Sequence, residues 1–470
     1  MTRLFGTNGV RGVINKDMTS QLALQMGKAI GTHMGGAVAI ATDTRTSAEM
    51  VKTAVMSGMM AVGCDVLDLG VLPTPAIQYF VKTHEGIMGG VMITASHNPP
   101  EYNGIKCIAA DGTEASRRDE ERIEEFFFSE IPNRPWNQTG GMERVYSAGD
   151  VYIDAVIGCV DSEAIRNARL RVCLDCANGA SYETSPLLMK KLGVGVTTLN
   201  ANAQGEFPGH LSEPTEENLK NLMSLTKATK SNLGIAHDGD ADRCVFVTSQ
   251  GRYVSGDKSL ALIAKFELSK KKGKVVTPVS SSSLVEDVVN EAGGIIKYTA
   301  VGSPIVARKM MEYEAGFGGE ENGGLIFAEH QYCRDGALAA AKMLECVAKN
   351  GPLHTQLSSF PVYYTDKRKI YCPNEHKQPL MDHIKTKYSP DYRTDITDGL
   401  KVLFDNGWVL ARPSGTETIF RIFSESKDEE QAKARAAEFE DTARGFLLKA
   451  GVPAEEIAPV VKKRRAPVKK

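Results

Sequence analysis

The sequence predicts an α/β protein with several domains. In the first third of the chain, helix-like segments alternate with short apolar strand-like segments, and this alternation is typical of α/β architecture. The chain has 470 residues. That length is too great for one hydrophobic core, so we expect three or four compact units of roughly 100–200 residues each. A composition of 42% hydrophobic and 24% charged residues is ordinary for a globular protein.

The elements of the first unit follow in order along the chain. Thr19 is a candidate helix N-cap before apolar residues at helical spacing, and the apolar segment 37–42 is a strand candidate. A second helix is expected over 47–63 and a short strand over 66–69. The small and apolar residues of 89–94 predict a buried strand.

Two similar series and a different last unit follow. The second series starts with a strand at 170–174, and the third starts after Gly251. The last unit starts near Pro361 and combines short strands with a final helix from Asp428. We therefore predict four domains and a basic flexible tail, at 1–150, 151–251, 252–361, 362–450 and 451–470.

Bulk properties narrow the class of protein. No apolar stretch approaches about 20 residues and no signal-peptide layout is visible, so we expect a cytoplasmic protein without membrane contact. The nine Cys fit reduced buried thiols better than disulfides, including the close pair Cys173 and Cys176. A net charge of -2 gives no reason to expect a polyanion partner. The basic end 462–470 is interpreted as a solvated tail, with nucleic-acid contact as the alternative.

The first candidate site is the segment Thr94-Ala95-Ser96-His97-Asn98-Pro99-Pro100. It follows the predicted buried strand, and the two prolines favour an extended, rigid loop that displays the Ser96 hydroxyl at the carboxyl end of a strand. The adjacent Ser and His do not by themselves make a hydrolase dyad, because a base must reach the hydroxyl in space. Taken alone, a polar turn remains the alternative.

The second candidate is Asp238-Gly239-Asp240-Ala241-Asp242-Arg243, between two apolar strand candidates. Carboxylates at every second position of a tight loop can converge on one point, and three of them suit a hard divalent ion such as Mg²⁺. A calcium-binding EF-hand is excluded, because its sixth and twelfth positions would be Arg243 and Ser249. The alternative, a solvated acidic turn, would leave three carboxylates repelling one another.

Two further loops have the composition of ligand-binding segments. The glycines of 318–324 surround Glu320, Glu321 and Asn322 and would let a polyhydroxyl ligand approach closely, although a plain Gly-rich turn is the alternative. The segment 412–417 combines the Arg412 guanidinium with hydroxyls and a glycine amide, a set suited to a phosphate dianion. It lacks the Gly-Lys-Ser or Gly-Lys-Thr of a nucleotide-binding loop.

In this order and spacing the four segments closely resemble the α-D-phosphohexomutase family. The family has a Ser-His-Asn-Pro serine loop, an Asp-Gly-Asp-x-Asp-Arg metal loop, a Gly-Glu sugar loop and a C-terminal phosphate loop. The match begins at the segment 5–12 and extends to the strand after Thr416, which is nearly the whole chain. The resemblance implies three similar mixed-sheet α/β domains and a smaller α+β C-terminal domain around a central cleft.

The resemblance also implies a role for each matching residue. Ser96 would carry the phosphoryl group as a phosphoserine, and one of its oxygens would bind Mg²⁺ together with Asp238, Asp240 and Asp242. The catalytic group would further include Arg11, Lys106 and His97. The residues that contact the substrate would be Arg243, Glu320, Asn322, Arg412, Ser414, Gly415 and Thr416, of which the last four would hold the phosphate that does not react.

The implied function is a phosphohexomutase that interconverts 6-phospho and 1-phospho sugars through a hexose 1,6-bisphosphate. Bacterial members often have Gly-Glu-Met-Ser-Gly-His in the sugar loop, whereas Asn322 and Gly324 replace the Ser and the His here. Gly302-Ser303 likewise stands where many bacterial enzymes have Gly-His. These departures resemble the archaeal branch and favour glucosamine 6-phosphate over mannose or glucose phosphates. A metal-dependent sugar phosphatase and a non-catalytic binding protein are the rival classes, and the oligomeric state is left open.

Overall fold

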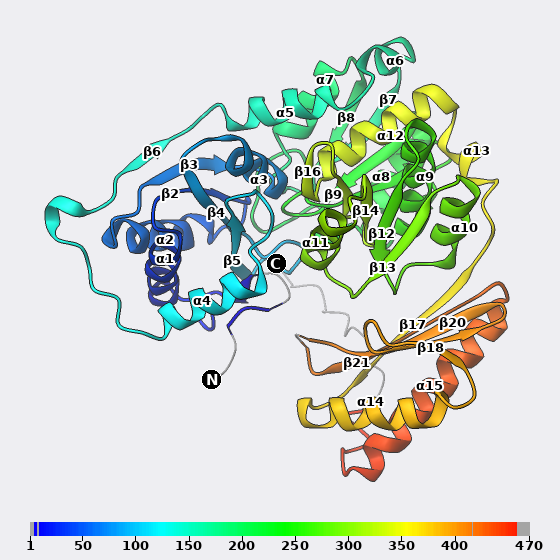
Figure 1. Ribbon diagram of the computed structural model, residues 1–470. Helices are drawn as coiled ribbons and strands as arrows, with labels where there is room; N and C mark the ends of the chain where they lie inside the picture. Colours follow the sequence, from blue (N-terminus) through cyan, green and yellow to red (C-terminus); the bar gives the residue numbers. More distant parts are fainter. Residues whose placement is uncertain (1–3, 7–8, 416, 458–470) are drawn as a thin grey trace, which may run out of the picture. The chain divides into compact units, whose positions relative to one another are not determined.

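The computed structural model describes residues 4–6, 9–415 and 417–457, and it contains four β-sheets (Figure 1). The chain divides into two compact units. The first unit contains the first two sheets and most of the third. The second consists of residues 278–284, 298–301 and the chain after Phe360, and it contains the fourth sheet. Each unit is described by itself below.

The first sheet has six strands in the order β1-β5-β4-β2-β3-β6, of which β4, β2, β3 and β6 are mutually parallel. Helices α1, α2 and α4 pack on one face of it around a core of Met, Val and Ile side chains (Figure 1). The bounds are β1 (Val10–Val13), α1 (Ser20–Met34), β2 (Ala37–Thr42), α2 (Ala48–Ala61), β3 (Val66–Val71), α3 (Thr74–Thr83), β4 (Ile87–Ile93), β5 (Tyr102–Ala109), α4 (Arg117–Phe127), the 3₁₀ turn η1 (Trp136–Gln138) and β6 (Met142–Arg144).

Helix α1 shows how local sequence sets these elements. The Thr19 hydroxyl accepts a hydrogen bond from the Leu22 amide at 3.2 Å and caps the helix as predicted. Gly27 lies where α1 crosses α2, and a Cβ atom there would lie 2.1 Å from the Val55 carbonyl oxygen. The two helices can therefore pack this closely only because the side chain is missing.

The second sheet has the order β11-β10-β9-β7-β8, in which β9, β7 and β8 are parallel and β10 is antiparallel to β9 and β11. Strand β11 lies just beyond the predicted domain boundary after residue 251 but belongs to this sheet. The bounds are α5 (Ala148–Gly158), α6 (Ser162–Asn167), β7 (Arg171–Asp175), α7 (Thr184–Lys191), β8 (Gly195–Leu199), α8 (Lys220–Ala228), β9 (Leu233–His237), β10 (Cys244–Thr248) and β11 (Tyr253–Val254).

The third sheet has the order β13-β12-β14-β15-β16, with β12 parallel to β14 and β15 antiparallel to both of its neighbours. Each of the three sheets is therefore mixed, as predicted. The bounds are α9 (Gly256–Lys270), β12 (Lys274–Pro278), α10 (Ser283–Glu291), β13 (Ile295–Thr299), α11 (Ser303–Tyr313), β14 (Phe317–Gly319), β15 (Leu325–Phe327), β16 (Gln331–Arg334), α12 (Gly336–Asn350) and α13 (Leu353–Leu357).

One structural pattern recurs in all three mixed sheets. A central strand has a parallel neighbour on one side and, on the other, the antiparallel strand that follows it in the chain; these strand pairs are β4 with β5, β9 with β10, and β14 with β15. A short loop joins each pair, at residues 94–101, 238–243 and 320–324. These are the serine loop, the metal loop and the sugar loop of the sequence, so the same point of the fold carries all three.

The fourth sheet is entirely antiparallel in the order β17-β21-β20-β19-β18, and α14 and α15 cover one of its faces (Figure 1). Val452 and Ile457 are buried in its core, so the first residues of the predicted tail are folded. Residues 458–470 lie outside the described residues. The bounds are β17 (Tyr364–Tyr371), α14 (Asn374–Tyr388), β18 (Arg393–Asp395), β19 (Leu400–Phe404), β20 (Gly407–Pro413), β21 (Ile419–Ser426) and α15 (Glu429–Lys449).

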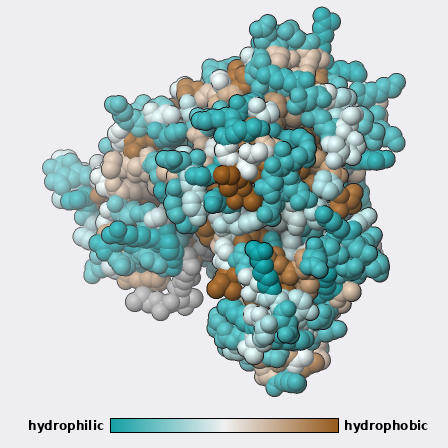
Figure 2. Space-filling view, turned by 45° about the vertical axis from the view of Figure 1, so that its right-hand side comes forward, coloured by the Kyte–Doolittle hydropathy of each residue, from teal (hydrophilic) through white to brown (hydrophobic). Residues whose placement is uncertain are grey.

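One face of the protein is mostly polar, and the cysteines form no disulfides within the described residues. The face shown in Figure 2 is predominantly hydrophilic, with scattered hydrophobic residues. Within the described part of the chain, no helix combines the length and the apolar character needed to cross a membrane. All nine cysteines are free thiols, and eight of them are buried.

Candidate functional site

The serine loop follows β4 and holds Ser96 in an unusual backbone conformation. Its φ is 52°, in the left-handed region, and its amide donates to the Thr94 hydroxyl at 2.8 Å. The sequence suggested that the Ser96 hydroxyl is displayed on the loop. In the structure the residue is buried, with only 1% of its surface exposed. The loop folds back between two sheets, which a prediction from strand and proline positions alone does not reveal.

A buried arginine that was not predicted, Arg45, fixes this loop. Its Nε atom lies 3.1 Å from Asp43 Oδ2, and that same oxygen accepts a hydrogen bond from the Thr94 hydroxyl at 2.6 Å. The phenyl ring of Phe207 lies 5.0 Å from the guanidinium carbon. The two remaining guanidinium nitrogens donate, over 2.6–2.9 Å, to the backbone carbonyls of Ser96, Asn98, Pro99 and Tyr102.

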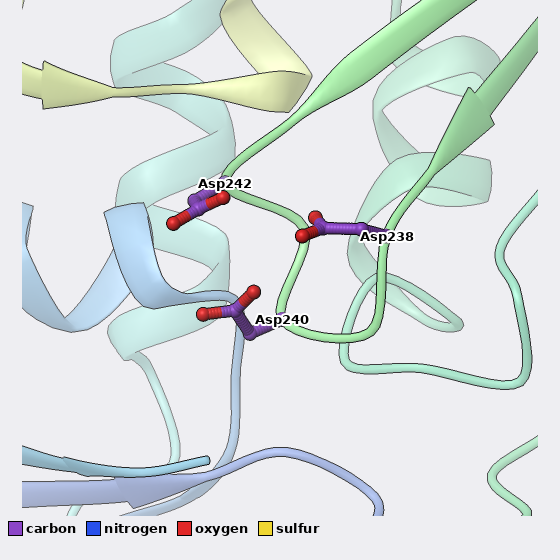
Figure 3. Close-up of side chains that lie close together, drawn as sticks. All are labelled: Asp238, Asp240 and Asp242. Carbon is purple, nitrogen blue, oxygen red and sulfur yellow. The ribbon is translucent and has the colours of Figure 1, made fainter. Parts of the chain in front are cut away.

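The metal loop brings its three aspartates together as predicted. Asp238, Asp240 and Asp242 point toward a shared space from the turn between β9 and β10 (Figure 3). One oxygen from each lies within 4.8 Å of the others, and all three side chains are buried. Ala241 has a φ of 56°, so the chain reverses direction between the second and third carboxylates.

The pKa values of Asp238 and Asp240 are strongly shifted by their surroundings. Burial, followed by the charges of Asp242 and Asp240, raises the pKa of Asp238 well above its usual range. Burial alone would raise the pKa of Asp240 too, but Lys106 and a hydrogen bond from Thr74 lower it. Asp240 Oδ1 and Asp242 Oδ1 are buried atoms without a hydrogen-bond partner. A cation between these oxygens would satisfy them, so the donor set fits a hard divalent metal ion.

Serine loop and metal loop meet directly. The Ser96 hydroxyl donates to Asp238 Oδ2 at 3.1 Å, and His97 Nδ1 lies 3.5 Å from the same hydroxyl oxygen. The charge of Arg243, then burial and the charge of Arg11, lower the pKa of His97 to about 2, so the imidazole is neutral at physiological pH. Arg11 donates to the Ala95 carbonyl at 3.3 Å, within the serine loop.

Basic side chains surround the three aspartates. Lys106 Nζ lies 2.6 Å from Asp240 Oδ2 and 3.6 Å from Asp242 Oδ2. The Arg243 Nε atom lies 3.8 Å from both Asp238 and Asp242 and is buried without a hydrogen-bond partner. The Arg243 guanidinium is therefore close to the carboxylates, but its Nε atom makes no hydrogen bond to them. This nitrogen can still donate to an anionic ligand.

Arg334, on β16, was not predicted and connects the metal loop with the sugar loop. Its guanidinium lies 2.5 Å from Asp242 Oδ2 and 3.4 Å from Glu320 Oε2. Burial alone would lower the pKa of Arg334. The negative charges of Asp242 and Glu114 outweigh burial, so the pKa lies above the ordinary arginine value. No sequence motif surrounds Arg334, so only the pairing of β15 with β16 could have identified it.

In the sugar loop, Glu320 lies beside Arg334, whereas the Asn322 side chain makes a hydrogen bond within the loop itself. Glu320 Oε1 accepts a hydrogen bond from the Gly302 amide at 3.1 Å. The Asn322 side-chain oxygen accepts from the Gly324 amide at 3.0 Å and so helps to form the turn. Gly323 has a φ of 88°, a conformation that favours glycine.

The predicted phosphate loop lies in the second unit. Arg412 lies on strand β20 rather than in the loop, and its Nε atom lies 3.1 Å from Asp398 Oδ2. Ser414 is buried and accepts a hydrogen bond from the Glu417 amide at 3.2 Å, while Gly415 is exposed. Thr416 lies outside the described residues. Lys377 Nζ donates to the carbonyls of Ser414 and Glu417, both at 2.7 Å.

Comparison with known proteins adds independent evidence. Sequence profiles of the phosphoglucomutase/phosphomannomutase α/β/α domains I, II and III match residues 2–134, 150–251 and 255–363, and the profile of the family's C-terminal domain matches 374–442. A phosphoglucomutase/phosphomannomutase of Thermococcus kodakarensis is 43% identical over 92% of this chain and 96% of its own length. A probable phosphoglucosamine mutase of Methanopyrus kandleri is 41% identical over 94% and 98%.

Solved structures give the same result. A phosphoglucomutase/phosphomannomutase family protein of Burkholderia thailandensis superposes with a TM-score of 0.83 at 27% identity, covering 95% of this chain and 97% of that one. An N-acetylphosphoglucosamine mutase of Aspergillus fumigatus, solved with GlcNAc-6P and magnesium, shares the fold with a TM-score of 0.58 at 15% identity, covering 95% and 96%.

The fold and the site thus define a phosphohexomutase, an isomerase that transfers a phosphoryl group within a sugar phosphate. More particularly, the chain belongs to the phosphoglucomutase/phosphomannomutase family. Relatives named phosphoglucosamine mutase and relatives named phosphoglucomutase/phosphomannomutase both match it at about 40% identity.

Proposed function

We propose that the protein interconverts glucosamine 6-phosphate and glucosamine 1-phosphate through a phosphoserine at Ser96 and a 1,6-bisphosphate intermediate. The observation that carries this proposal is the 3.1 Å contact between the Ser96 hydroxyl and Asp238, one of three converging carboxylates. A nucleophilic hydroxyl, a divalent-metal donor set and several cations in one buried cluster meet the needs of phosphoryl transfer.

Mg²⁺ is the metal that best fits this donor set. One oxygen each from Asp238, Asp240 and Asp242, together with a phosphoserine oxygen, would hold it, and hard oxygen ligands of this kind suit Mg²⁺. When bound, Mg²⁺ supplies positive charge to the oxygens of the phosphoryl group. The unpartnered Oδ1 atoms of Asp240 and Asp242 support this assignment.

The protein's own residues supply the remaining charge and position. Arg11, Lys106 and Arg243 come from three different elements around Ser96 and would face the phosphoryl oxygens, where they stabilise negative charge. The neutral His97 imidazole contacts the Ser96 hydroxyl oxygen and is the proposed hydrogen-bond partner there. Transfer breaks the bond between Ser96 Oγ and phosphorus and forms one to a sugar oxygen, and as that sugar hydroxyl loses its proton Ser96 Oγ takes one up. In the second half the other phosphoryl group of the bisphosphate moves from its sugar oxygen to Ser96 Oγ, and the proton moves in the opposite direction.

Burial of Ser96 supports a mutase over a phosphatase. The residue is 1% exposed, so a phosphoryl group on it would be screened from water and would pass to a sugar hydroxyl instead. The phosphatase alternative predicts net release of phosphate. We assign Glu320 and Asn322 to sugar hydroxyls, and Arg412, Ser414, Gly415 and Thr416 to the phosphate that does not react. These assignments, the four domain boundaries and the central cleft belong to the proposal.

The choice of glucosamine rests on the names of relatives and on the sugar loop. Several archaeal relatives at 39–41% identity are named phosphoglucosamine mutase. The relative at 43% identity is named phosphoglucomutase/phosphomannomutase, so interconversion of mannose or glucose phosphates is the second candidate function.

Ser96→Ala tests the mechanism. The variant should lose mutase activity, while its fold should be retained because only about one hydrogen bond, worth roughly 0.5–1.5 kcal/mol, disappears. Intact-mass measurement after incubation with glucose 1,6-bisphosphate should find one added phosphate on the unaltered protein and none on the variant. Ser259→Ala is the matched control, because that buried hydroxyl donates to the carbonyls of Ser255 and Gly256 in the first turn of its own helix. Full mutase activity in Ser96→Ala would reject the proposal.

A further inference from the structure

Two of the three aspartates, Asp240 and Asp242, engage one carboxylate oxygen with the protein and leave the other without a hydrogen bond. Asp240 Oδ2 accepts from Lys106 Nζ at 2.6 Å and from the Thr74 hydroxyl at 2.7 Å. Asp242 Oδ2 accepts from the Arg334 guanidinium at 2.5 Å. The Oδ1 atom of each aspartate is buried and has no hydrogen-bond partner. Each of these carboxylates therefore has one oxygen left for a metal ion.

Asp238 differs, because both of its oxygens accept hydrogen bonds. Oδ1 accepts from the Arg243 amide at 3.2 Å, and Oδ2 accepts from the Ser96 hydroxyl at 3.1 Å. The second bond would disappear on phosphorylation of Ser96, because the esterified oxygen has no proton to donate. In the proposed phosphorylated form, Asp238 would thus also have one engaged oxygen and one free oxygen.

The side chain of Arg334 is fixed at both ends of its reach. Its stem passes over Gly324, where a Cβ atom would lie 2.2 Å from Arg334 Cδ and 2.9 Å from Cγ. At the far end, the guanidinium also donates to Glu320 Oε2 at 3.4 Å, and the residue is buried. These contacts leave the guanidinium little freedom to release Asp242.

We propose that Lys106 and Arg334 select Mg²⁺ over Ca²⁺ by limiting Asp240 and Asp242 to one metal-binding oxygen each. The inference rests on the metal site of the proposed function. Ca²⁺ takes about six to eight oxygen ligands and often binds both oxygens of a carboxylate, whereas Mg²⁺ prefers a compact octahedral set and keeps several waters. Single carboxylate oxygens with a phosphoryl oxygen and water therefore suit Mg²⁺ and leave Ca²⁺ with too few protein ligands.

This selection acts through geometry rather than through charge alone. Positive charges near the site repel Mg²⁺ and Ca²⁺ to a similar extent, because both ions carry the same charge. A carboxylate whose second oxygen is held by a buried cation cannot turn to offer both oxygens. Arg243 provides the contrast, because its Nε atom lies 3.8 Å from carboxylate oxygens of Asp238 and Asp242 without a hydrogen bond. Its loss removes a charge but releases no carboxylate oxygen.

The test measures metal affinity directly, without turnover. Chelated protein, shown by intact mass to be unphosphorylated, is titrated with Mg²⁺ and with Ca²⁺ in a calorimeter. Arg334→Met removes the donor to Asp242, and Lys106→Met removes one donor to Asp240. Arg243→Met is the control for loss of charge. Thermal unfolding without metal establishes which variants fold.

A second pair of variants changes no charge. Gly324→Ala places a Cβ atom against the Arg334 stem and so moves the guanidinium away from Asp242. Gly316→Ala is its control, because this exposed glycine lies just before β14 and no atom is within 4 Å of a Cβ there. The Gly324 variant and Lys106→Met carry the test where Arg334→Met does not fold.

We expect the preference for Mg²⁺, as the ratio of the Ca²⁺ and Mg²⁺ dissociation constants, to fall roughly tenfold in Arg334→Met, Lys106→Met and Gly324→Ala, a usual effect of losing the partner of a metal ligand. The ratio should stay unchanged in Arg243→Met and Gly316→Ala. An equal change for both ions in the first three variants, or an unaltered protein without a preference for Mg²⁺, would overturn the inference. Binding of neither ion to the unaltered protein would instead overturn the metal site of the proposed function.

Discussion

The Ser96 hydroxyl and the Asp238 carboxylate, which follow the central strands of two different sheets, are joined by a hydrogen bond of 3.1 Å. In the phosphorylated protein the same two groups would be a dianion and a carboxylate. Burial and its two aspartate neighbours already raise the pKa of Asp238, so the protein strongly disfavours more negative charge at this point. We therefore expect a cation to accompany phosphorylation.

Removal of the metal is expected to stop turnover. Exhaustive chelation should abolish mutase activity, and added Mg²⁺ should restore it, because the carboxylates of Asp238, Asp240 and Asp242 would otherwise repel the phosphoryl group. Calorimetric titration of the chelated protein should show Mg²⁺ binding that is weakened in Asp240→Asn. Undiminished turnover of the metal-free protein would contradict the assignment.

Arg45→Lys is expected to slow phosphorylation of Ser96. Lysine keeps the charge but loses the planar fork that donates to four loop carbonyls, and unmade bonds to buried carbonyls cost about 1–3 kcal/mol each. Mass spectrometry should show slower labelling by glucose 1,6-bisphosphate, with a larger fall in kcat than rise in KM. Arg117→Lys, in an exposed helical pair with Glu121, is the control. Unchanged labelling in a folded Arg45→Lys protein would show that the loop keeps its position without the fork.

Arg412→Ala is expected to weaken substrate binding rather than chemistry at Ser96. A charge-assisted hydrogen bond contributes about 1.5–3 kcal/mol, so affinity for the sugar monophosphate should fall by that amount while Ser96 is still labelled by bisphosphate. Asp398→Asn, which removes the carboxylate 3.1 Å from Arg412 Nε, should have a smaller effect in the same direction. Arg393→Ala, an exposed arginine of the same sheet, is the control. Lost labelling with unchanged affinity would place Arg412 at the reacting centre.

Stability is expected to fall at alkaline pH through His330. Burial would lower its pKa, but Asp335 at 3.4 Å and Cys159 at 3.8 Å raise it to about 9, and the ring stacks on Tyr79. Because the folded pKa exceeds the unfolded value of about 6.5, the stabilisation is full below that pH and is lost as the pH rises through about 9. It is at most about 3 kcal/mol, from 1.36 kcal/mol per pKa unit.

Thermal unfolding at a series of pH values checks this expectation. The melting temperature of the unaltered protein should fall between about pH 7 and 10 more steeply than that of His330→Gln, which cannot be protonated. Identical slopes for the two proteins would exclude His330 as the responsible group.

The sequence was sufficient to predict the motif-bearing loops and the convergence of the three aspartates. Carboxylates at alternate positions of a tight turn have few ways to lie other than together, and Ala241 in the left-handed region completes that turn. The Thr19 cap followed from equally local chemistry. Such features depend on residues close together in the chain, so the sequence pattern alone determines them.

Features that depend on packing between distant segments were missed. Arg45 and Arg334 have no motif around them, and each reaches the site only through sheet order and loop docking. The predicted display of the Ser96 hydroxyl was likewise wrong, because a loop bounded by prolines gives no indication of what covers it. The sequence analysis also placed Arg412 in a loop, whereas β20 continues through Pro413 because both residues pair with β21.

The recurrence of one loop position in three sheets has a consequence for how such enzymes diversify. A serine, a carboxylate triad and a glycine-rich segment occupy the same turn of the three sheets, so one backbone arrangement carries the three segments to which we assign different roles. A laboratory library that varies only residues 94–101, 238–243 and 320–324 would therefore sample new chemistry while the main hydrophobic cluster of each of the three domains keeps its native sequence.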